Sequence, residues 1–219
     1  MESHSKKPEH PILNLTQRLR MAHVKRWHIV CTATPQSVAE HTLRVEWITE
    51  DFLKTAGMFN YDDNFTLNAL RWAKIHDLPE VLLGDVPTPG KEIIESINWA
   101  TSPTGDDMLL EDVFEIAHSM VDREWHELRD CLDSNKSMRG VIWLVKLADL
   151  VEAMDFLAIN GLGFHAHHVW NGMYQAFEQL TLKYSEFNFP NLLAHRICER
   201  AFQVATLEAK ERGWVKLDN

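Results

Sequence analysis

The sequence predicts an all-helical protein, and three observations lead to that expectation. Apolar residues recur at steps of three and four along several long segments, which is the spacing of one face of an α-helix. No segment shows a convincing alternation of apolar and polar residues of the kind that typifies a strand. The chain has 219 residues, of which 45% are hydrophobic, so it can bury a sizeable core. We expect a single domain over residues 1–219.

The first clear helix is expected from about Val38 to Ala56. It opens with Ser37-Val-Ala-Glu40, a capping box in which the serine accepts from the third helical N–H while the glutamate reaches back, and Gly57 can close it. One face of this helix carries Val38, His41, Val45, Ile48 and Phe52. Since that face must be buried, His41 is expected to point inward.

A second helix should end near the residue before Pro79, because a proline disfavours helical geometry in the residue that precedes it. Its apolar stripe consists of Phe65, Ala69, Trp72, Ala73 and His76. His76 is therefore also expected inside. The prolines between Gly84 and Gly90 indicate a loop, and helical patterning resumes from Lys91 to Trp99 and again from about Asp106 to Asp130.

Two carboxylates interrupt a core face of the helix expected from Met138 to Ile159. The stripe consists of Ile142, Val145, Asp149, Glu152 and Phe156. Burying a carboxylate is costly unless the group is paired, so Asp149 and Glu152 both need partners. Two further helices, roughly Phe164 to Ser185 and Asn191 to Gly213, complete the all-helical prediction.

Charge and composition exclude some classes of partner. The net charge is −10, and an acidic surface repels the backbone of a long nucleic acid, so we expect no such ligand. The N-terminus lacks the apolar region of a secretory signal, and apolar runs are interrupted by charges, so we expect no membrane insertion. Three distant cysteines without a CxxC pair fit a reducing compartment. The protein is therefore predicted to be cytoplasmic.

Four residues from three helices form a candidate metal site: His41, His76, Asp77 and Asp149. Metal binding would offset the cost of burying both aspartates, and imidazole is the commonest nitrogen ligand for first-row metals. Mixed nitrogen and oxygen donors suit Zn, Mn, Co, Ni or Fe(II) and leave coordination positions for water. Neighbours on a regular helix diverge by about 100°, so His76 and Asp77 can share an ion only where the helix ends, and Pro79 supplies that ending.

These four positions resemble the H…HD…D signature of the HD phosphohydrolase superfamily. Further motifs resemble the YfbR-like bacterial 5′-deoxynucleotidases over about residues 14–160: Arg26-Trp27, Glu40-His41, His76-Asp77-x-x-Glu80, Gly84-Asp85-x-Pro-Thr-Pro and Lys146-x-Ala-Asp149. The phage triphosphohydrolases that remove dATP resemble the chain equally well, including the run Arg26-Trp27-His28-Ile29. The motifs alone do not separate the two groups.

The resemblance implies an HD-domain helical bundle whose C-terminal helices, at 164–213, pack on the motif-bearing part. It implies one divalent transition metal (Zn, Co or Mn), held by His41, His76, Asp77 and Asp149, that activates water against phosphorus. The substrate would be a small 2′-deoxyribonucleotide, and the chain would form a homodimer or a higher homo-oligomer.

The motifs are compatible with three functions. The first is a 5′-deoxynucleotidase, which converts a dNMP and water to a deoxynucleoside and phosphate. The alternative enzyme is a dNTP triphosphohydrolase that prefers dATP and releases triphosphate. The third is a helical nucleotide-sensing module that keeps the metal for stability and has no turnover.

Glu80 and Asp85 are the candidate catalytic residues. Glu80 follows Asp77 by three residues and is our first choice of general base, provided that the turn after Pro79 stays helical. By resemblance, Asp85 handles the leaving oxygen or a sugar hydroxyl. The ordinary interpretations are a solvated first-turn carboxylate for Glu80 and a turn residue for Asp85.

The candidate substrate-binding residues are Arg26, Lys91, Trp27 and Ile29. Arg26 presents a planar fork that matches phosphate oxygens, and Lys91 opens a helix whose first N–H groups also favour an anion. Trp27 and Ile29 offer apolar surface for a base or deoxyribose. Lys91 could equally be a surface lysine, and Trp27 a core residue.

Two polar features are left outside this assignment. His165-Ala-His167-His168 is interpreted as a partly exposed helix end rather than a second metal site, because no carboxylate pattern accompanies it. Glu152, one turn after Asp149, either supports a ligand or faces another helix, and the sequence does not decide.

Overall fold

The computed structural model describes residues 15–58, 63–85, 123–136, 138–187 and 189–215. All regular elements in these ranges are helices, which confirms the predicted fold class. Extended pairing in the same ranges is limited to two isolated β-bridges between residues outside the helices. The elements are α1 (Leu15–Arg18), η1 (Leu19–Ala22), α2 (Val38–Thr55), α3 (Asp63–Ile75), α4 (Glu80–Leu83), α7 (Arg123–Ser134), α8 (Arg139–Asn160), α9 (Gly163–Leu182), η3 (Tyr184–Phe187) and α10 (Asn191–Glu211).

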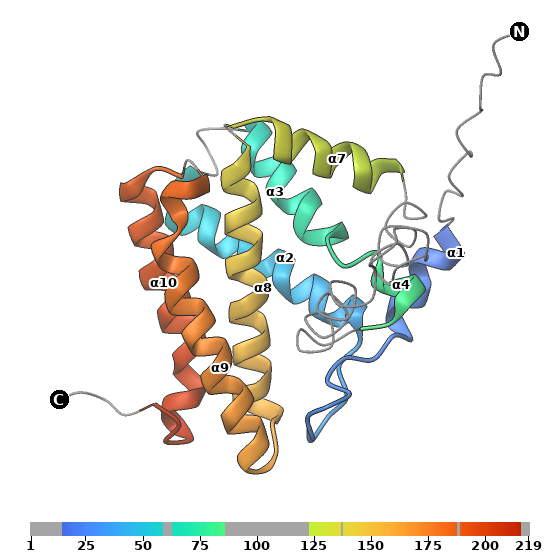
Figure 1. Cartoon of the computed structure of the whole chain (residues 1–219), viewed down its shortest axis with the longest axis vertical. Coiled ribbons are helices and arrows are strands. Elements are labelled where there is room, and N and C mark those ends of the chain that lie inside the picture. Colours follow the sequence, from blue (N-terminus) through green and yellow to red (C-terminus); the bar gives the residue numbers. More distant parts are fainter. Residues whose placement is uncertain (1–14, 59–62, 86–122, 137, 188, 216–219) are drawn as a thin grey trace, which may run out of the picture.

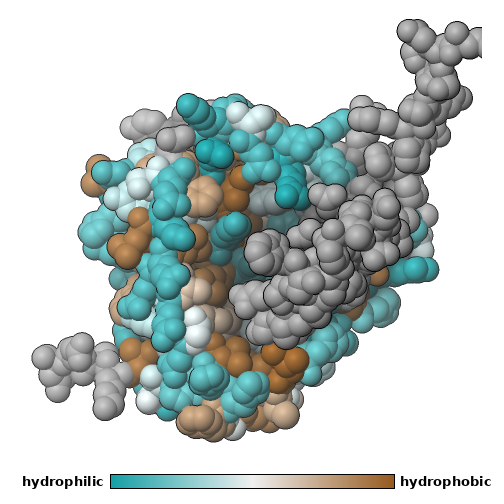
Figure 2. All heavy atoms as spheres, viewed as in Figure 1, coloured by the Kyte–Doolittle hydropathy of each residue, from teal (hydrophilic) through white to brown (hydrophobic). Residues whose placement is uncertain are grey.

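Helix α8 is the centre of the bundle. It contacts α2, α3, α9 and α10. In Figure 1, α3 lies on one side of α8 and α9 and α10 lie on the other, while α2 crosses behind α8. Its large side chains, such as Trp143, Leu147 and Met154, are fully buried. Each such side chain contributes about 1.5–3 kcal/mol of hydrophobic stabilisation, so α8 is the element around which the others pack. In Figure 2 hydrophilic residues cover much of the outer helices, while hydrophobic ones lie along the middle of the face, over α8.

The limits of α2 follow the predicted signals. The Oγ of Ser37 accepts from the N–H of Glu40 at 3.2 Å, as the capping box predicts. The helix ends at Thr55, and Gly57 follows with φ of 70°, the left-handed conformation that glycine adopts at low cost. His41 lies on the buried face of α2, as predicted.

Helix α3 ends earlier than predicted, at Ile75 rather than close to Pro79. The N–H of His76 still bonds to the carbonyl of Trp72, but the N–H of Leu78 bonds back only three residues, to Ile75. The chain therefore tightens from an α-helix into a narrower turn before the proline. A four-residue helix, α4, then begins at Glu80.

The segment 23–37, between η1 and α2, is fastened at two places. At its base Lys25 and Ser37 form an isolated bridge, so the segment closes on itself. At its tip, Thr32 forms a bridge with Gly161, just beyond the end of α8. The N–H of Ala33 also donates to the carbonyl of Asn160 at 2.7 Å. Arg26 and Trp27 are therefore held on a loop with a defined position against α8.

Two of the predicted helices can be followed only in part. The helix expected at Lys91–Trp99 lies outside the described residues. Of the segment expected at Asp106–Asp130, the structure describes α7, which continues to Ser134. The last two helices, α9 and α10, lie close to their predicted limits, and both pack on α8. None of the helices in the described ranges has the length and apolarity needed to cross a membrane.

Candidate metal centre and nucleotide site

The structure brings the four predicted metal ligands together. His41 projects from α2, His76 and Asp77 follow the end of α3, and Asp149 projects from α8. The Nε2 of His41 lies 3.0 Å from Asp149 Oδ1 and 3.2 Å from Asp77 Oδ2. The Nε2 of His76 lies 3.3 Å from Asp77 Oδ1. One ligand atom each from His41, His76 and Asp149 falls within 4.8 Å of the others, close enough to share one ion.

The early end of α3 is what allows His76 and Asp77 to face the same point. The tight turn that follows rotates Asp77 away from the direction it would take on a continuing helix. This turn is closed by the N–H of Glu80, which donates to the carbonyl of Asp77 at 3.0 Å. The turn also places Glu80 as the first residue of α4, with a half-buried side chain.

Both imidazoles present Nε2 to the cluster because their Nδ1 atoms are occupied elsewhere. The Nδ1 of His76 lies 2.8 Å from the carbonyl oxygen of Ala73, which can only accept, so Nδ1 carries the proton. The Nδ1 of His41 lies 2.5 Å from Glu152 Oε2. In both rings the lone pair is thereby left on Nε2, the atom that faces the carboxylates.

The chemistry of this donor set fits a divalent transition metal. Both Nε2 atoms are buried and have no hydrogen-bond partner among the residues that the structure describes. Carboxylate oxygens lie 3.0–3.3 Å away, but they are not aligned as hydrogen-bond acceptors. Buried polar atoms almost always have partners, so two unpaired nitrogens aimed at one point call for a shared ligand. Two imidazole nitrogens and two carboxylates match Zn, Co or Mn.

The electrostatics keep the two aspartates ionised, as metal ligation requires. Burial by itself would raise the pKa of Asp77, but His76, His41 and Arg26 outweigh it and hold that pKa well below its usual range. The pKa of Asp149 is also lowered, because the contact with His41 outweighs burial and the repulsion of Asp77.

The pKa of His41 is raised, whereas the pKa values of the two aspartates are lowered. Burial lowers the pKa of His41, and so does the nearby Arg26. Three carboxylates outweigh these two effects and raise that pKa well above its ordinary value: Glu152, Asp149 and Asp77. Positive charge is therefore favoured at the point where the four side chains meet.

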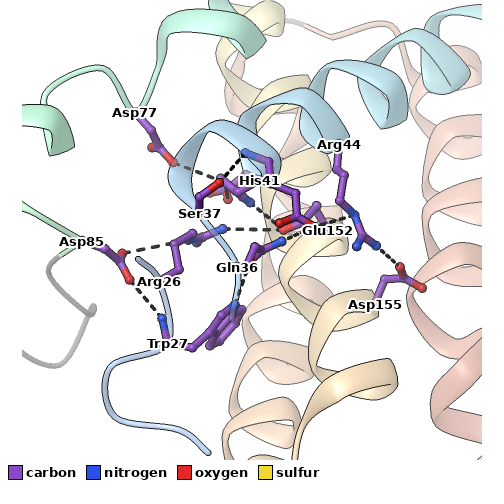
Figure 3. Close-up of polar contacts among 12 residues, drawn as sticks. Arg26, Trp27, Gln36, Ser37, His41, Arg44, Asp77, Asp85, Glu152 and Asp155 are labelled. Carbon is purple, nitrogen blue, oxygen red and sulfur yellow. Dashed lines mark hydrogen bonds and ion pairs between the residues drawn. The ribbon is translucent and has the colours of Figure 1, made fainter. Parts of the chain in front are cut away.

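The structure decides the role of Glu152, which the sequence left open. Its side chain is fully buried and faces α2. Besides His41, it accepts from the Nε2 of Gln36 at 2.7 Å and pairs with the Nε of Arg44 at 3.0 Å (Figure 3). Arg44 pairs in turn with Asp155 at 2.7 Å. Glu152 is therefore a buried carboxylate with a complete set of partners behind a metal-ligand candidate.

Sequence reasoning missed Gln36 and Arg44, although one signal pointed to Arg44. A carboxylate three residues after Asp149 on a core face needs buried donors. Arg44 lies three residues after His41 and so on nearly the same side of α2, which makes it a natural partner. Gln36, directly before the Ser37 cap, has no comparable signal, because its position depends on how the 23–37 loop folds.

Arg26 lies beside the cluster with its side chain 14% exposed. Its Nη1 is 3.6 Å from Glu152 Oε2, and its Nε is 4.0 Å from Asp85 Oδ1. Both nitrogens are buried and lack a hydrogen-bond acceptor within the described ranges. Burial lowers the pKa of Arg26, but the surrounding carboxylates, Asp149 and Asp77 foremost, outweigh it and raise that pKa. A charged fork with unused donors beside a metal-ligand cluster suits a phosphate group.

Trp27 has positive φ, 68°, which is rare for a bulky residue. Three contacts hold it there: its backbone N–H donates to Asp85 Oδ2 at 3.3 Å, its indole Nε1 donates to Gln36 Oε1 at 2.8 Å, and its ring stacks on Phe156. The side chain is half-buried, so one part packs on the core while another faces solvent. Strain of this kind persists only where surrounding contacts enforce it, and it clusters at ligand sites.

The other residues singled out from the sequence lie as follows. Ile29 lies on the same loop and is 52% exposed. Lys91 lies outside the described residues. The histidines of the run 165–168 lie in the first turns of α9, exposed or half-exposed, as interpreted from the sequence. No second group of metal-ligating side chains comparable to the first occurs in the described part of the chain.

An all-helical bundle that gathers His from one helix, His-Asp from the turn after a second and Asp from a third defines an HD phosphohydrolase. The structure is similar to that of the HD phosphohydrolase of cyanophage S-2L, solved with dA and one catalytic Zn²⁺ ion. The TM-score is 0.68 and the identity 30%, and the match covers 91% of this chain and 99% of the other. The sequence model of the YfbR-like 5′-deoxynucleotidases matches residues 15–162. The chain belongs to the YfbR-like 5′-deoxynucleotidase family.

Two relatives differ in the reaction for which they are named. The dATP triphosphohydrolase of cyanophage S-2L is 34% identical over 158 residues, which cover 70% of this chain and 74% of the relative. A 5′-deoxynucleotidase of Vibrio parahaemolyticus is 37% identical over 75 residues, which cover 33% of this chain and 37% of that protein. Both of the enzyme classes expected from the motifs are therefore represented among its relatives.

Proposed function

We propose that the protein is a phosphohydrolase of 2′-deoxyribonucleotides that uses one divalent transition metal, Zn, Co or Mn. The observation that carries the proposal is the meeting of two buried imidazole nitrogens with two carboxylates, beside the buried guanidinium of Arg26. Among the residues that the structure describes, neither the two nitrogens nor the Nε and Nη1 of Arg26 have a hydrogen-bond partner. The ligands are His41, His76, Asp77 and Asp149. Such an ion, when bound, lowers the pKa of water toward neutrality and polarises a phosphoryl oxygen.

The protein's own groups supply binding and proton transfer. The guanidinium of Arg26 binds the phosphate through Nε and Nη1, and Lys91 adds a second cation. Glu80, which the turn after Asp77 holds at the start of α4, takes the proton of the attacking water. Asp85, fixed by the backbone N–H of Trp27, binds a sugar hydroxyl or returns a proton to the leaving oxygen. Trp27 and Ile29 form the wall that the deoxyribose or base contacts.

The first reaction proposed is that of a 5′-deoxynucleotidase, in which a dNMP and water give a deoxynucleoside and phosphate. The match to the family model over residues 15–162 and the Vibrio relative support it. The second candidate is hydrolysis of dATP to deoxyadenosine and triphosphate. It is favoured by the cyanophage enzyme, which aligns over most of both chains.

Product analysis tests both reactions. Protein loaded with Zn, Co or Mn is incubated with each dNMP, with the matching NMPs and with dATP, and the products are separated by chromatography. Orthophosphate from a dNMP supports the first reaction, whereas an intact triphosphate from dATP supports the second. If none of these phosphates is released with any metal, the protein is not such a hydrolase, and the nucleotide-sensing alternative is tested by calorimetric binding of dAMP and dATP.

The assembly state is part of the same proposal. We propose a homodimer or higher homo-oligomer of a chain that forms one domain over residues 1–219. Light scattering coupled to size-exclusion chromatography measures the mass directly, and a mass near 25.4 kDa, that of one chain, would contradict the oligomer.

A further inference from the structure

We infer that Glu152 is a positioning residue that connects the metal centre to the 23–37 loop, which carries Trp27. One of its carboxylate oxygens fixes the ring of metal ligand His41. The other, through Gln36, fixes the indole of Trp27. Figure 3 shows the chain of contacts from Trp27 through Gln36 and Glu152 to His41. The inference rests on the proposed function, since it treats the cluster around His41 as a metal centre.

The two carboxylate oxygens of Glu152 contact different residues. Oε2 lies 2.5 Å from His41 Nδ1, and Oε1 accepts from Gln36 Nε2 at 2.7 Å. An ionised carboxylate can only accept, so His41 must donate from Nδ1. The ring is thereby held in the tautomer and orientation that direct the Nε2 lone pair toward Asp77 and Asp149.

Oε1 of Glu152 is connected to Trp27 through the side-chain amide of Gln36. The side chain of Gln36 is fully buried, and its Oε1 accepts from the indole Nε1 of Trp27 at 2.8 Å. Because its NH₂ group is committed to Glu152, the amide cannot turn over without breaking both bonds. The indole therefore takes its position from the same carboxylate that orients His41. Trp27 also needs such support because its φ is positive.

The carboxylate itself is held by Arg44. Burying an ionised carboxylate with 0% exposure is strongly unfavourable unless it is paired. Arg44 supplies the opposite charge at 3.0 Å, and Asp155 fixes the far side of that guanidinium at 2.7 Å. Glu152 is thus anchored independently of the metal ligands, as a group that positions them must be.

The test replaces the carboxylate by an amide of nearly the same shape, Glu152→Gln. A positioning role predicts a Zn²⁺ affinity about 10- to 100-fold weaker, measured by competition with a chromophoric chelator at fixed pH. The control is Asp51→Asn, the same chemical change in an ion pair between α2 and Arg200 of α10, which should leave the affinity unchanged. If the Glu152→Gln protein is folded and binds Zn²⁺ within twofold of the wild type, the inference is wrong.

The connection from Glu152 through Gln36 to Trp27 is tested separately with Gln36→Leu. This change removes the link to Trp27 but leaves Glu152 in contact with His41. We expect Zn²⁺ affinity to stay within about twofold while KM for the nucleotide rises by roughly 2- to 10-fold. An unchanged KM would overturn the link to the 23–37 loop.

A measurement on the wild-type protein guards against variants that fail to fold. In ¹⁵N-labelled, Zn²⁺-loaded protein, the inference predicts that His41 carries its proton on Nδ1 in a strong hydrogen bond, seen as a downfield N–H signal. A deprotonated or metal-bound Nδ1 would overturn it. If the wild type neither binds metal nor hydrolyses nucleotides, the proposed function fails. If it does both but Glu152→Gln matches it, only this inference fails.

Discussion

The indole ring of Trp27 lies parallel to the ring of Phe156, with centroids 5.7 Å apart and planes 5° from parallel. Phe156 is buried on α8, two turns beyond the metal-ligand candidate Asp149. The stack therefore ties the loop that carries Arg26 to the helix that carries this metal-ligand candidate. In the proposed function, Trp27 is an apolar wall for the nucleotide, and the stack makes the position of that wall depend on the core.

Substitution of Phe156 by leucine should loosen this wall. Loss of the stacked pair and of buried volume is expected to lower the free energy of unfolding by about 1–2 kcal/mol. Because Trp27 loses its support, the inhibition constant of deoxyadenosine should rise, whereas that of orthophosphate should not. Phe177→Leu on α9, an equally buried ring, is the control, which should lose stability without any change in inhibition. Equal inhibition constants for Phe156→Leu and wild type would contradict the prediction.

Removal of the metal should destabilise the protein. A ligand that binds only the folded state adds about 2.7 kcal/mol at a free concentration 100 times its dissociation constant. We therefore expect the unfolding temperature to fall on treatment with a chelator and to recover when Zn²⁺ is added. In an Asp149→Asn variant, which lacks one ligand, the addition of Zn²⁺ should shift the unfolding temperature much less. Identical responses of the two proteins in differential scanning calorimetry would rule out Asp149 as a ligand.

Local patterns predicted the helices and the residues of the cluster, but not the contacts behind it. The inward direction of His41 follows from periodicity. A helix end before Pro79 was also predicted, although α3 stops earlier than expected, at Ile75, and the turn that follows brings His76 and Asp77 together. Those signals lie within one element, where spacing alone fixes geometry. The partners of Glu152 come from the crossing of α2 over α8 and from a loop that closes on itself. Such relationships are set by tertiary packing, which leaves no periodic trace in the sequence.

The positive φ of Trp27 could not be predicted for a related reason. A bulky residue has no intrinsic tendency toward this conformation. It is imposed by Asp85, Gln36 and Phe156, which come from three separate parts of the chain. The sequence analysis placed Trp27 among the candidate substrate-binding residues, and the structure adds which contacts hold it in place.

Glu80→Gln should reduce turnover without releasing the metal. An amide keeps the shape of the side chain but cannot take a proton from water, and loss of a general base typically costs 10²- to 10⁴-fold in rate. We expect kcat to fall by about that factor, with Zn²⁺ content and unfolding temperature close to those of wild type. Glu50→Gln, a half-exposed glutamate paired with Lys54 on α2, is the matched control. If Glu80→Gln retains wild-type kcat, another group is the base.

The three cysteines should differ in reactivity. Burial raises the pKa of the Cys198 thiol to about 11, whereas Cys31 and Cys131 are exposed. The thiolate is the reactive form, so at pH 8 Cys198 should be labelled far more slowly than the other two. Because burial favours the protonated form, its labelling rate should keep rising as the pH approaches 11. Three equal rates in a mass-spectrometric time course at pH 8 would contradict the burial of Cys198.

Arg26→Lys should separate phosphate binding from nucleoside binding. Lysine keeps the charge but replaces the planar fork, so the paired donors Nε and Nη1 are lost. Hydrogen bonds to charged groups contribute about 1.5–3 kcal/mol, so KM for the nucleotide should rise by about 10- to 100-fold. The inhibition constant of orthophosphate should rise in parallel, while that of deoxyadenosine, which has no phosphate, should stay within about twofold. Arg71→Lys, an exposed arginine paired with Glu124, serves as the control. If deoxyadenosine binding weakens as much as phosphate binding, Arg26 acts by supporting Trp27 rather than by holding the phosphate.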